Sequence, residues 1–317
     1  MSEVYTSRSD LSGLIPEPVT REIMQGTVEN SAVMSMGRRL PNMTSGTQTM
    51  NVLDMLPMAY FVNGDTGYKK TTKMKWDKKK IYAEEIAVIV PIAEAVLDDA
   101  DYDIWGEAKP RIQAAFGQVF DAAVLFGTNK PSSWRAGLVP SAISAGNEVQ
   151  QTSTPDVYQD LLGPGGVFSH VEADGFDVNG VMAGISMKSV LRGLTDQVGR
   201  PIYKHENIQG RTQYDLDGVP MNFPKNGSFD ETASLLIAGD FNELVYAIRK
   251  DITYKILTEA TIQDPSDGSI VYNLAQQDMV ALRCVMRIGW EIPNPINYLQ
   301  PTAANRFPFA VYTPYSD

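Results

Sequence analysis

The chain has 317 residues, of which 43% are hydrophobic and 21% charged. This composition is typical of a globular protein and excludes extensive disorder and collagen-like or mucin-like chains. The formal net charge is −11 at pH 7, so the average surface repels phosphate and gives no basis for tight general binding of DNA. The apolar runs at 86–90 and 235–238 are far shorter than the ~20 residues that cross a bilayer, and the polar start lacks the layout of a signal peptide. We therefore expect a soluble, unexported protein with no membrane partner.

Residues that usually carry catalysis or bind metals are few. Cys284 is the single cysteine, so an internal disulfide is excluded and a buried, structural thiol is expected. The two histidines, His170 and His205, lie in no metal-binding spacing, and there is neither a phosphate-binding G-x-x-x-x-G-K loop nor a G-x-S-x-G elbow. Adjacent carboxylates such as Asp98 and Asp99 leave a carboxylate-dependent hydrolase as a distant alternative. We predict no catalytic residue, no cofactor and no metal site.

The first part of the chain predicts a short helix and a long hairpin. Two prolines and the acids around them in 16–22 favour a helix that reaches about Glu29. Segments 43–62 and 68–80 flank the turn sequence NGDTG at 63–67. Turn chemistry between two extended segments predicts a long hairpin or an extended loop.

A predicted strand and a predicted long helix come next. Segment 81–92 alternates between two sets of side chains, which is the strand period, and Pro91 is expected to mark the end of the strand. From 104 to 126 apolar residues recur every three or four positions, which predicts one amphipathic helix ended by Gly127. Pro110 is expected to kink this helix or to mark a late start. The apolar residues of the predicted stripe are Ile104, Ala108, Ile112, Ala115, Phe116, Val119, Ala123 and Phe126.

The remainder of the chain mixes short helices and strands. Segment 128–151 is expected to be a loop, and Thr154 is predicted to cap a helix whose first residue is Pro155. The glycine-rich segment 163–166 then interrupts that helix. Further predicted elements are strands at 178–183, 219–223 and 235–238, a helix at 187–196, and extended segments within 244–257 and 279–290. This mixture predicts an α+β fold with two subdomains that share crossings of the chain.

Two segments of opposite charge follow one another. The first is a dense set of lysines: Lys69, Lys70, Lys73, Lys75, Lys78, Lys79 and Lys80. The second is a run of acids without a basic residue until Lys109: Glu94, Asp98, Asp99, Asp101, Asp103 and Glu107. Like charges at this density repel one another unless opposite charges of a partner compensate them. We therefore interpret the two segments as complementary patches of a subunit interface. Two alternatives stay open: two solvated surfaces, or a nucleic-acid patch that uses Trp76 and Tyr82.

Short segments resemble, in their order along the chain, landmarks of the major capsid proteins of tailed bacteriophages. Each is weak alone, but together they cover about 14–300, and chance would seldom reproduce their order over that length. The segments are 14–16 (LIP), 21–24 (REIM), 29–33 (ENSAV), 59–62 (AYFV) with Gly67, 93–99 (AEAVLDD), 121–127 (DAAVLFG) with 137–138 (GL), 199–203 (GRPIY), 216–220 (LDGVP), 238–241 (AGDF) and 278–283 (DMVALR).

The resemblance implies an α+β fold of the Hong Kong 97 type. Its expected parts are an N-terminal arm at 1–42, an E-loop with its base strands at 43–92, the spine helix region of a peripheral domain at 93–129, an axial domain at 130–245, and a return to the peripheral domain with a C-terminal tail at 246–317. The lysine segment then falls on the E-loop and the acidic segment on the spine region. Because only about thirteen residues precede the first landmark, we expect any scaffolding protein to be a separate chain.

The implied function is structural, and the protein is not an enzyme. Copies would assemble into hexamers and pentamers and then into an icosahedral or prolate shell around double-stranded DNA, in a virion assembled in the host cytoplasm. The implied partners are other copies, a portal, a separate scaffolding protein, a decoration protein and the packaged DNA, held by weak non-specific contacts. An encapsulin, which is a bacterial protein compartment of the same fold, is the alternative, and the phage-like arm motif argues against it.

Some members of this family link their subunits by an isopeptide bond between an E-loop lysine and an asparagine, with a nearby glutamate as base. Alignment of 273–285 with the family puts Asp278 at the asparagine position and Val285 at the glutamate position. A carboxylate has no amide nitrogen to expel and valine accepts no proton, so we expect no such link. The structural readings are a loop or strand-start carboxylate for Asp278 and a core strand residue for Val285. Asn294 and Asn297 remain as conceivable substitutes.

Overall fold

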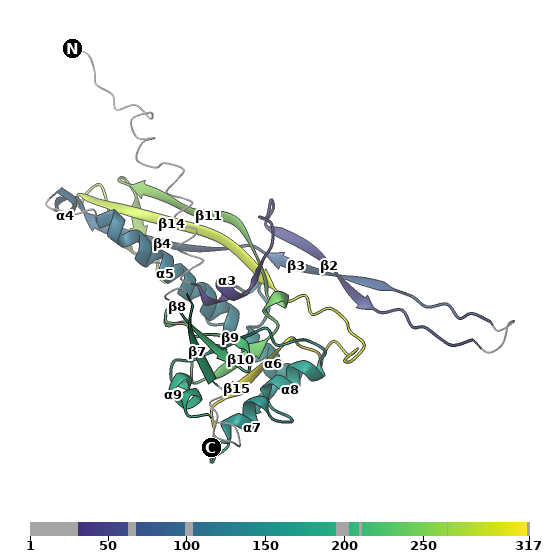
Figure 1. Cartoon of the computed structure of the whole chain (residues 1–317). Coiled ribbons are helices and arrows are strands. Elements are labelled where there is room, and N and C mark those ends of the chain that lie inside the picture. Colours follow the sequence, from purple (N-terminus) through teal and green to yellow (C-terminus); the bar gives the residue numbers. More distant parts are fainter. Residues whose placement is uncertain are drawn as a thin grey trace, which may run out of the picture.

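The computed structural model describes residues 31–62, 68–98, 104–194, 203–208, 211–264 and 266–315. The chain folds into an α+β body built on two sheets, from which a long β-hairpin projects (Figure 1). The predicted helix that reaches Glu29 lies outside the described residues. The first described helix is α3 (Ala32–Met36), which the sequence did not predict.

The first sheet has four strands in the order β1-β11-β14-β4. Strand β1 (Arg38–Arg39) pairs in parallel with β11 (Val245–Leu257), and β14 (Met279–Glu291) pairs antiparallel with β11 and β4 (Glu84–Ala93). Helix α5 (Ile104–Leu125) lies along this sheet (Figure 1). Its apolar face joins the core residues of β14, so burial of apolar surface holds helix and sheet together.

The strand predicted at 81–92 is two strands. Strand β3 (Lys75–Tyr82) ends and β4 begins on either side of Ala83, and the alternation of buried side chains changes phase there. Strand β4 also continues through Pro91 to Ala93, which corrects the expected end. Because β4 is an edge strand of its sheet, Pro91 can lack an N–H without leaving a neighbouring strand unpaired.

The long helix is confirmed, and Pro110 lies inside it without delaying its start. Gly127 follows with φ of +76°, a conformation that few residues other than glycine adopt. The predicted apolar stripe needs one correction. Ala115 and Val119 are exposed, with Val119 at 50%, while Gln113 and Asp121 are buried. The buried face of α5 is thus turned relative to the one that the apolar spacing alone indicated.

The second sheet has seven strands in the order β5-β15-β10-β6-β9-β8-β7. Its two faces are both covered: helices α7 (Val157–Leu162), α8 (Val167–Ala173) and α9 (Met187–Arg192) pack on one face, and α6 (Leu138–Ala145) with the main core packs on the other. Central strands buried on both faces are continuously apolar, as LIAG in β10 and FAVYT in β15 are. The strands are β5 (Glu148–Gln150), β6 (Gly180–Ala183), β7 (Tyr203–Ile208), β8 (Arg211–Leu216), β9 (Val219–Asn222), β10 (Leu236–Gly239) and β15 (Phe309–Thr313).

Several predicted boundaries in this part are wrong. The expected loop at 128–151 contains α6 (Leu138–Ala145) and β5. Helix α7 (Val157–Leu162) is capped by Asp156, whose carboxylate accepts from the Gln159 amide at 3.2 Å, instead of by Thr154. An aspartate caps a helix as well as a threonine does, so the local sequence allowed either start. The predicted interruption at 163–166 is confirmed, since it separates α7 from α8 (Val167–Ala173).

Other strands follow the predictions more closely. The predicted strands at 178–183, 219–223 and 235–238 appear as β6, β9 and β10 with shifted ends, and the extended segments appear as β11 and β14. Within the described residues the helix predicted at 187–196 is α9 (Met187–Arg192). Strand β15, near the end of the chain, pairs with β10 and β5. The division of the chain into the five named parts stays a prediction.

Candidate intersubunit surfaces

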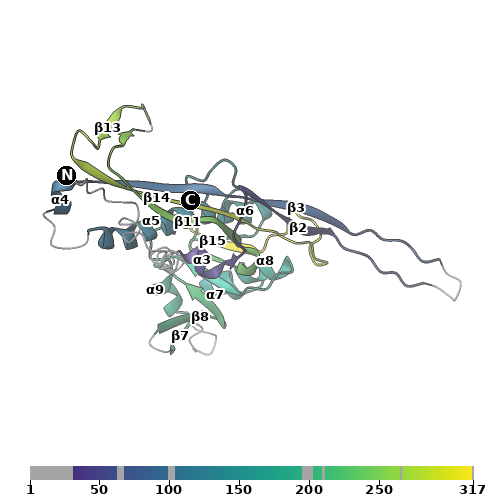
Figure 2. The same ribbon diagram turned by 90° about the horizontal axis from the view of Figure 1, so that it is seen from above.

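The predicted hairpin is present as β2 (Thr47–Met55) and β3, which pair antiparallel from Thr47↔Tyr82 to Met55↔Lys75. The hairpin and the chain beyond its paired part extend well past the body (Figures 1 and 2). Large apolar side chains there are exposed, which is costly for an isolated chain and typical of a surface that a partner covers. They are Met55, Met58, Tyr60, Phe61, Val62, Tyr68, Met74 and Trp76.

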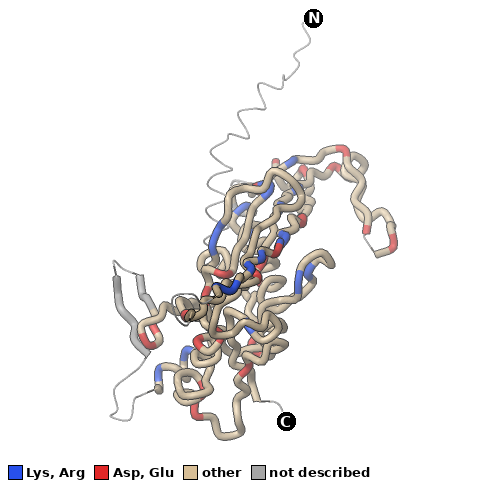
Figure 3. The backbone as a smooth tube through the Cα atoms, turned by 90° about the vertical axis from the view of Figure 1, so that its right-hand side faces the viewer, with Lys and Arg blue, Asp and Glu red and all other residues tan. Residues whose placement is uncertain are grey.

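All seven predicted lysines lie on this projection. Lys75, Lys78, Lys79 and Lys80 belong to β3, and Lys69, Lys70 and Lys73 precede it. Figure 3 shows the molecule from the end that bears the hairpin, with Lys and Arg coloured blue. Lys75 pairs with Asp54 of the same hairpin at 2.7 Å, and this contact holds the pKa of Asp54 below its usual value. Lys70 lies 5.0 Å from the centroid of the Tyr60 ring.

Only two of the predicted acids have side chains among the described residues. Glu94 and Asp98 lie exposed on α4 (Glu94–Asp98). Asp99, Asp101 and Asp103 fall outside the described residues, as does the side chain of Glu107 on α5. Helix α4 sits at the opposite end of the elongated molecule from the hairpin (Figures 1 and 2). The described acids and the lysines are therefore not brought together within one chain.

A buried carboxylate that the sequence did not single out joins three distant segments. Asp121 of α5 is 0% exposed. It accepts hydrogen bonds from the Ser31 hydroxyl at 2.5 Å, the Ala32 and Val33 amides at 2.9 and 3.2 Å, and the Asn226 side chain at 2.8 Å. Burial raises the pKa of Asp121, and these hydrogen bonds act in the opposite direction. The sequence signals were an acid on an apolar helix and the two family landmarks, 29–33 and 121–127, that this carboxylate joins.

Trp134 fixes the root of the hairpin. Its indole N–H donates to the Tyr82 carbonyl at the end of β3, at 3.0 Å. Its ring meets Phe120 of α5 and Trp290 of β14 edge-on, with centroids 6.0 and 6.3 Å apart. The hairpin is thus attached to the helix and to the four-stranded sheet through one side chain.

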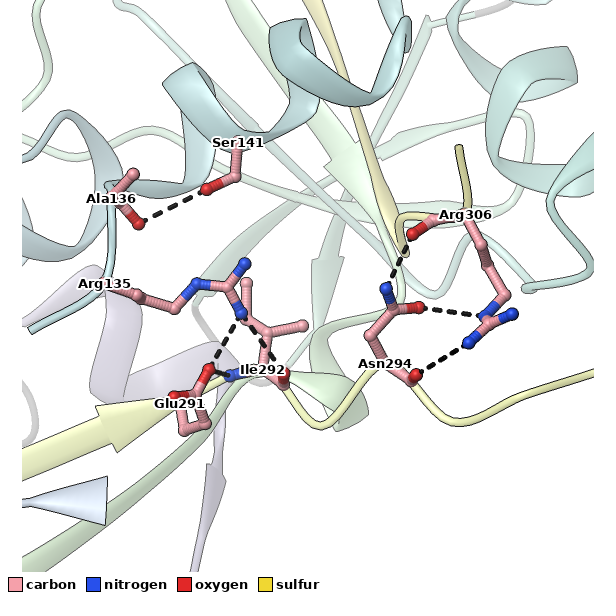
Figure 4. A network of polar contacts seen from close by, with 7 residues as sticks. All are labelled: Arg135, Ala136, Ser141, Glu291, Ile292, Asn294 and Arg306. Carbon is pink, nitrogen blue, oxygen red and sulfur yellow. Dashed lines mark hydrogen bonds and ion pairs between the residues drawn. The ribbon is translucent and has the colours of Figure 1, made fainter. Parts of the chain in front are cut away.

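A cavity of about 420 Å³ lies beside this root, between the hairpin and the body. Two of its arginines already have partners in the chain (Figure 4). Arg135 donates to Glu291 at 2.8 Å and to the Ile292 carbonyl at 3.2 Å. Arg306, only 4% exposed, donates to Asn294 and to the Gln300 carbonyl. These contacts tie the segment after β14 to the body.

Val285 lies on β14, and Asp278 directly precedes this strand. Asp278 precedes the strand with φ of +46°, and its carbonyl accepts from the Glu94 amide at 2.9 Å. Val285 pairs with Ala87 and Thr253 in the sheet and is 9% exposed. Next to it, Cys284 is fully buried, as expected for a structural thiol.

Neither a metal site nor a membrane span is found among the described residues. No three His, Cys, Asp or Glu side chains among them gather closely enough to hold a metal ion. In that part of the chain, no helix combines the length and the apolar character needed to span a bilayer.

Comparison with known proteins decides the family. The model of the phage capsid family matches residues 12–300. The chain belongs to the phage capsid family. A curated relative of this capsid protein, the major capsid protein of Staphylococcus phage 80alpha, is 29% identical over 283 residues, which cover 88% of this chain and 82% of that protein.

Solved structures of tailed-phage capsids match almost the whole capsid protein. A structure from Microbacterium phage Oxtober96 has a TM-score of 0.77 at 36% identity, covering 98% of this chain and 100% of that one. A structure from Mycobacterium phage Adephagia has a TM-score of 0.76 at 28% identity, covering 99% of each chain. The capsid protein therefore has the Hong Kong 97-type fold and is a structural, self-assembling component of a tailed-phage virion. The encapsulin alternative is not favoured.

Proposed function

We propose that this capsid protein forms hexamers and pentamers that close into an icosahedral or prolate shell around double-stranded DNA. The observation that carries the proposal is the projecting hairpin, whose apolar side chains are exposed far from the body of their own chain. A surface on one end that fits a different surface on a second copy produces head-to-tail contacts, which close into rings. The lysines of 69–80 then meet an acidic surface of a neighbouring copy, which includes the acids of 94–107.

The proposed assembly takes place in the host cytoplasm with a portal, a separate scaffolding protein and a decoration protein as partners. In this arrangement 1–42 acts as the arm, 43–92 as the E-loop with its base strands, 93–129 as the spine region, 130–245 as the axial domain, and 246–317 as the return to the peripheral domain and tail. Packaged DNA makes only weak non-specific contacts, because the net charge of −11 repels phosphate.

Phe61 and Tyr68 provide a direct test, because they are 106% and 98% exposed and so contribute little to folding. The double variant Phe61→Ser/Tyr68→Ser should keep the melting temperature of the subunit and form about ten-fold fewer shells, since buried aromatic anchors dominate interfaces. Yield is measured by sedimentation and negative-stain microscopy after co-expression with the scaffolding protein.

The matched control is Tyr158→Ser/Tyr315→Ser, which removes two exposed aromatic side chains away from the hairpin. It should assemble much as the unaltered chain does. A normal shell yield from the hairpin variant would contradict the role of the hairpin. An unaltered subunit that stays monomeric with its scaffolding protein and portal present would contradict the proposed assembly itself.

A further inference from the structure

The register of the hairpin divides its side chains between two faces. Successive residues of a strand point to opposite sides, and directly paired residues of two strands share a side. The inner face carries Gln48, Met50 and Val52 of β2 with Asp77, Lys79 and Ile81 of β3. The outer face carries Thr47, Thr49, Asn51 and Leu53 of β2 with Trp76, Lys78, Lys80 and Tyr82 of β3.

Burial shows that the inner face is the one turned toward the body. Ile81 is 0% exposed and packs with Val245 and Ala247 of β11, and Met50 packs against the same cluster. Val52, Asp77 and Lys79 of this face line the cavity at the root of the hairpin, as do Leu53 and Asp54 beside the register shift of β2. The inner face is therefore already occupied by its own chain, at least over the part near the body.

The two faces differ in charge. On the inner side Asp77 lies between Lys75 and Lys79 along the strand, and Lys75 pairs with Asp54, so two cations face two acids. The outer face has Lys78 and Lys80 and no acid, and both lysines are exposed. Trp76 and Tyr82, which are 60% and 39% exposed, flank them. The uncompensated positive charge of the paired hairpin thus lies wholly on the outer face.

Helix α4 offers the complementary charges. Glu94 and Asp98 are one turn apart, both are exposed, and the helix EAVLD has no basic residue. Residues i and i+4 of a helix are separated by about 6 Å along its axis. Lys78 and Lys80, two residues apart on a strand, are separated by about 7 Å. Two lysines can therefore face two carboxylates at the same time, but not in one chain, because α4 lies at the far end of the molecule.

We propose that the outer face of the hairpin docks on α4 of a second copy, with Lys78 and Lys80 against Glu94 and Asp98. This docking rests on the proposed assembly and makes it more specific. It divides the lysine segment by role: Lys78 and Lys80 hold the neighbouring copy, whereas Lys75 and Lys79 balance the acids of their own hairpin.

Two double variants, which remove the same number of positive charges, test the two faces of the hairpin separately. Lys78→Gln/Lys80→Gln and Lys75→Gln/Lys79→Gln each remove two cations from the same strand. The outer pair should lower shell yield about five-fold, because the loss is repeated at every contact of the shell, and the inner pair should stay within about two-fold of the unaltered chain. Circular dichroism melting of the unassembled subunits verifies that both variants fold. An equal loss from both pairs, or a normal yield from the outer pair, would overturn the assignment of the faces.

A charge exchange identifies the partner helix. Lys78→Glu/Lys80→Glu and Glu94→Lys/Asp98→Lys should each reduce assembly, and the chain that carries all four substitutions should recover most of the yield. No recovery would overturn docking on α4. Assembly of the unaltered chain in the same assay tests the proposed function separately, and its failure would overturn both proposals.

Discussion

The carboxyl group of Asp121 accepts four hydrogen bonds in a site closed to solvent, and three of the donors belong to residues 31–33. Asp121→Ala would remove the acceptor of the buried donors of residues 31–33, so we expect a loss of about 3 kcal/mol in the free energy of unfolding. Urea unfolding of the unassembled subunit measures it. Asp121→Asn keeps one acceptor oxygen and should lose less.

Amide exchange distinguishes a general loss of stability from a local release of residues 31–33. Amide exchange at Ala32 and Val33 should accelerate in Asp121→Ala more than exchange in the central strand β14 does. If all these amides accelerate equally, Asp121 does not hold residues 31–33 in place.

Cys284 gives a second prediction at the scale of one residue. Burial raises the pKa of its thiol to about 11, so at pH 8 only about 0.1% is the reactive thiolate. The folded subunit should react with a thiol reagent at least about 100-fold more slowly than the same chain in guanidinium, where the pKa returns to its ordinary value. Fast labelling of the folded subunit at pH 8 would show that Cys284 is accessible.

At the scale of an element, two neighbouring positions of α5 differ in burial. Phe120 is 0% exposed and contacts Trp134, whereas Val119 is 50% exposed. Phe120→Ala should cost about 3–5 kcal/mol because it leaves a cavity in the core. Val119→Ala should change the free energy of unfolding by no more than about 0.5 kcal/mol. Comparable losses in urea unfolding would mean that the two faces of the helix have been assigned wrongly.

At the scale of the whole particle, we predict that the shell has no covalent isopeptide links. Asp278 has no amide to react, and Val285 lies in the sheet and carries no base. The two asparagines that could replace Asp278 as acceptor already have partners in the chain. The side-chain amide of Asn294 donates to the Arg306 carbonyl at 2.6 Å, and the side-chain amide of Asn297 donates to the Asp174 carbonyl at 2.7 Å.

Mature particles boiled in detergent should therefore give one band at the subunit mass of 34.9 kDa on a denaturing gel. A ladder of multimers, or material that fails to enter the gel, would refute the prediction. Stability must then come from interface area, from the hairpin and arm of neighbouring copies, or from a decoration protein.

Local periodicity determined the elements that repeat a pattern over many residues. The helix at 104–125, the hairpin of β2 and β3, and strands β11 and β14 follow from apolar spacing and turn chemistry within one segment. The charge segments and the order of the family landmarks were also readable in the chain itself. Short elements such as α6, β5 and β15 were missed, because a continuous apolar run such as FAVYT has no period that distinguishes strand from helix.

Only the tertiary structure decided which side of each element is buried and against what. Ala83 changes the phase between β3 and β4 because the strands belong to different sheets. Val119 is exposed and Asp121 buried because α5 meets residues 31–33 and Asn226, which are far away in the sequence. The lysines of β3 divide into two faces through their pairing with β2. These outcomes depend on contacts between distant segments, and a side chain's own neighbours in the sequence do not encode them.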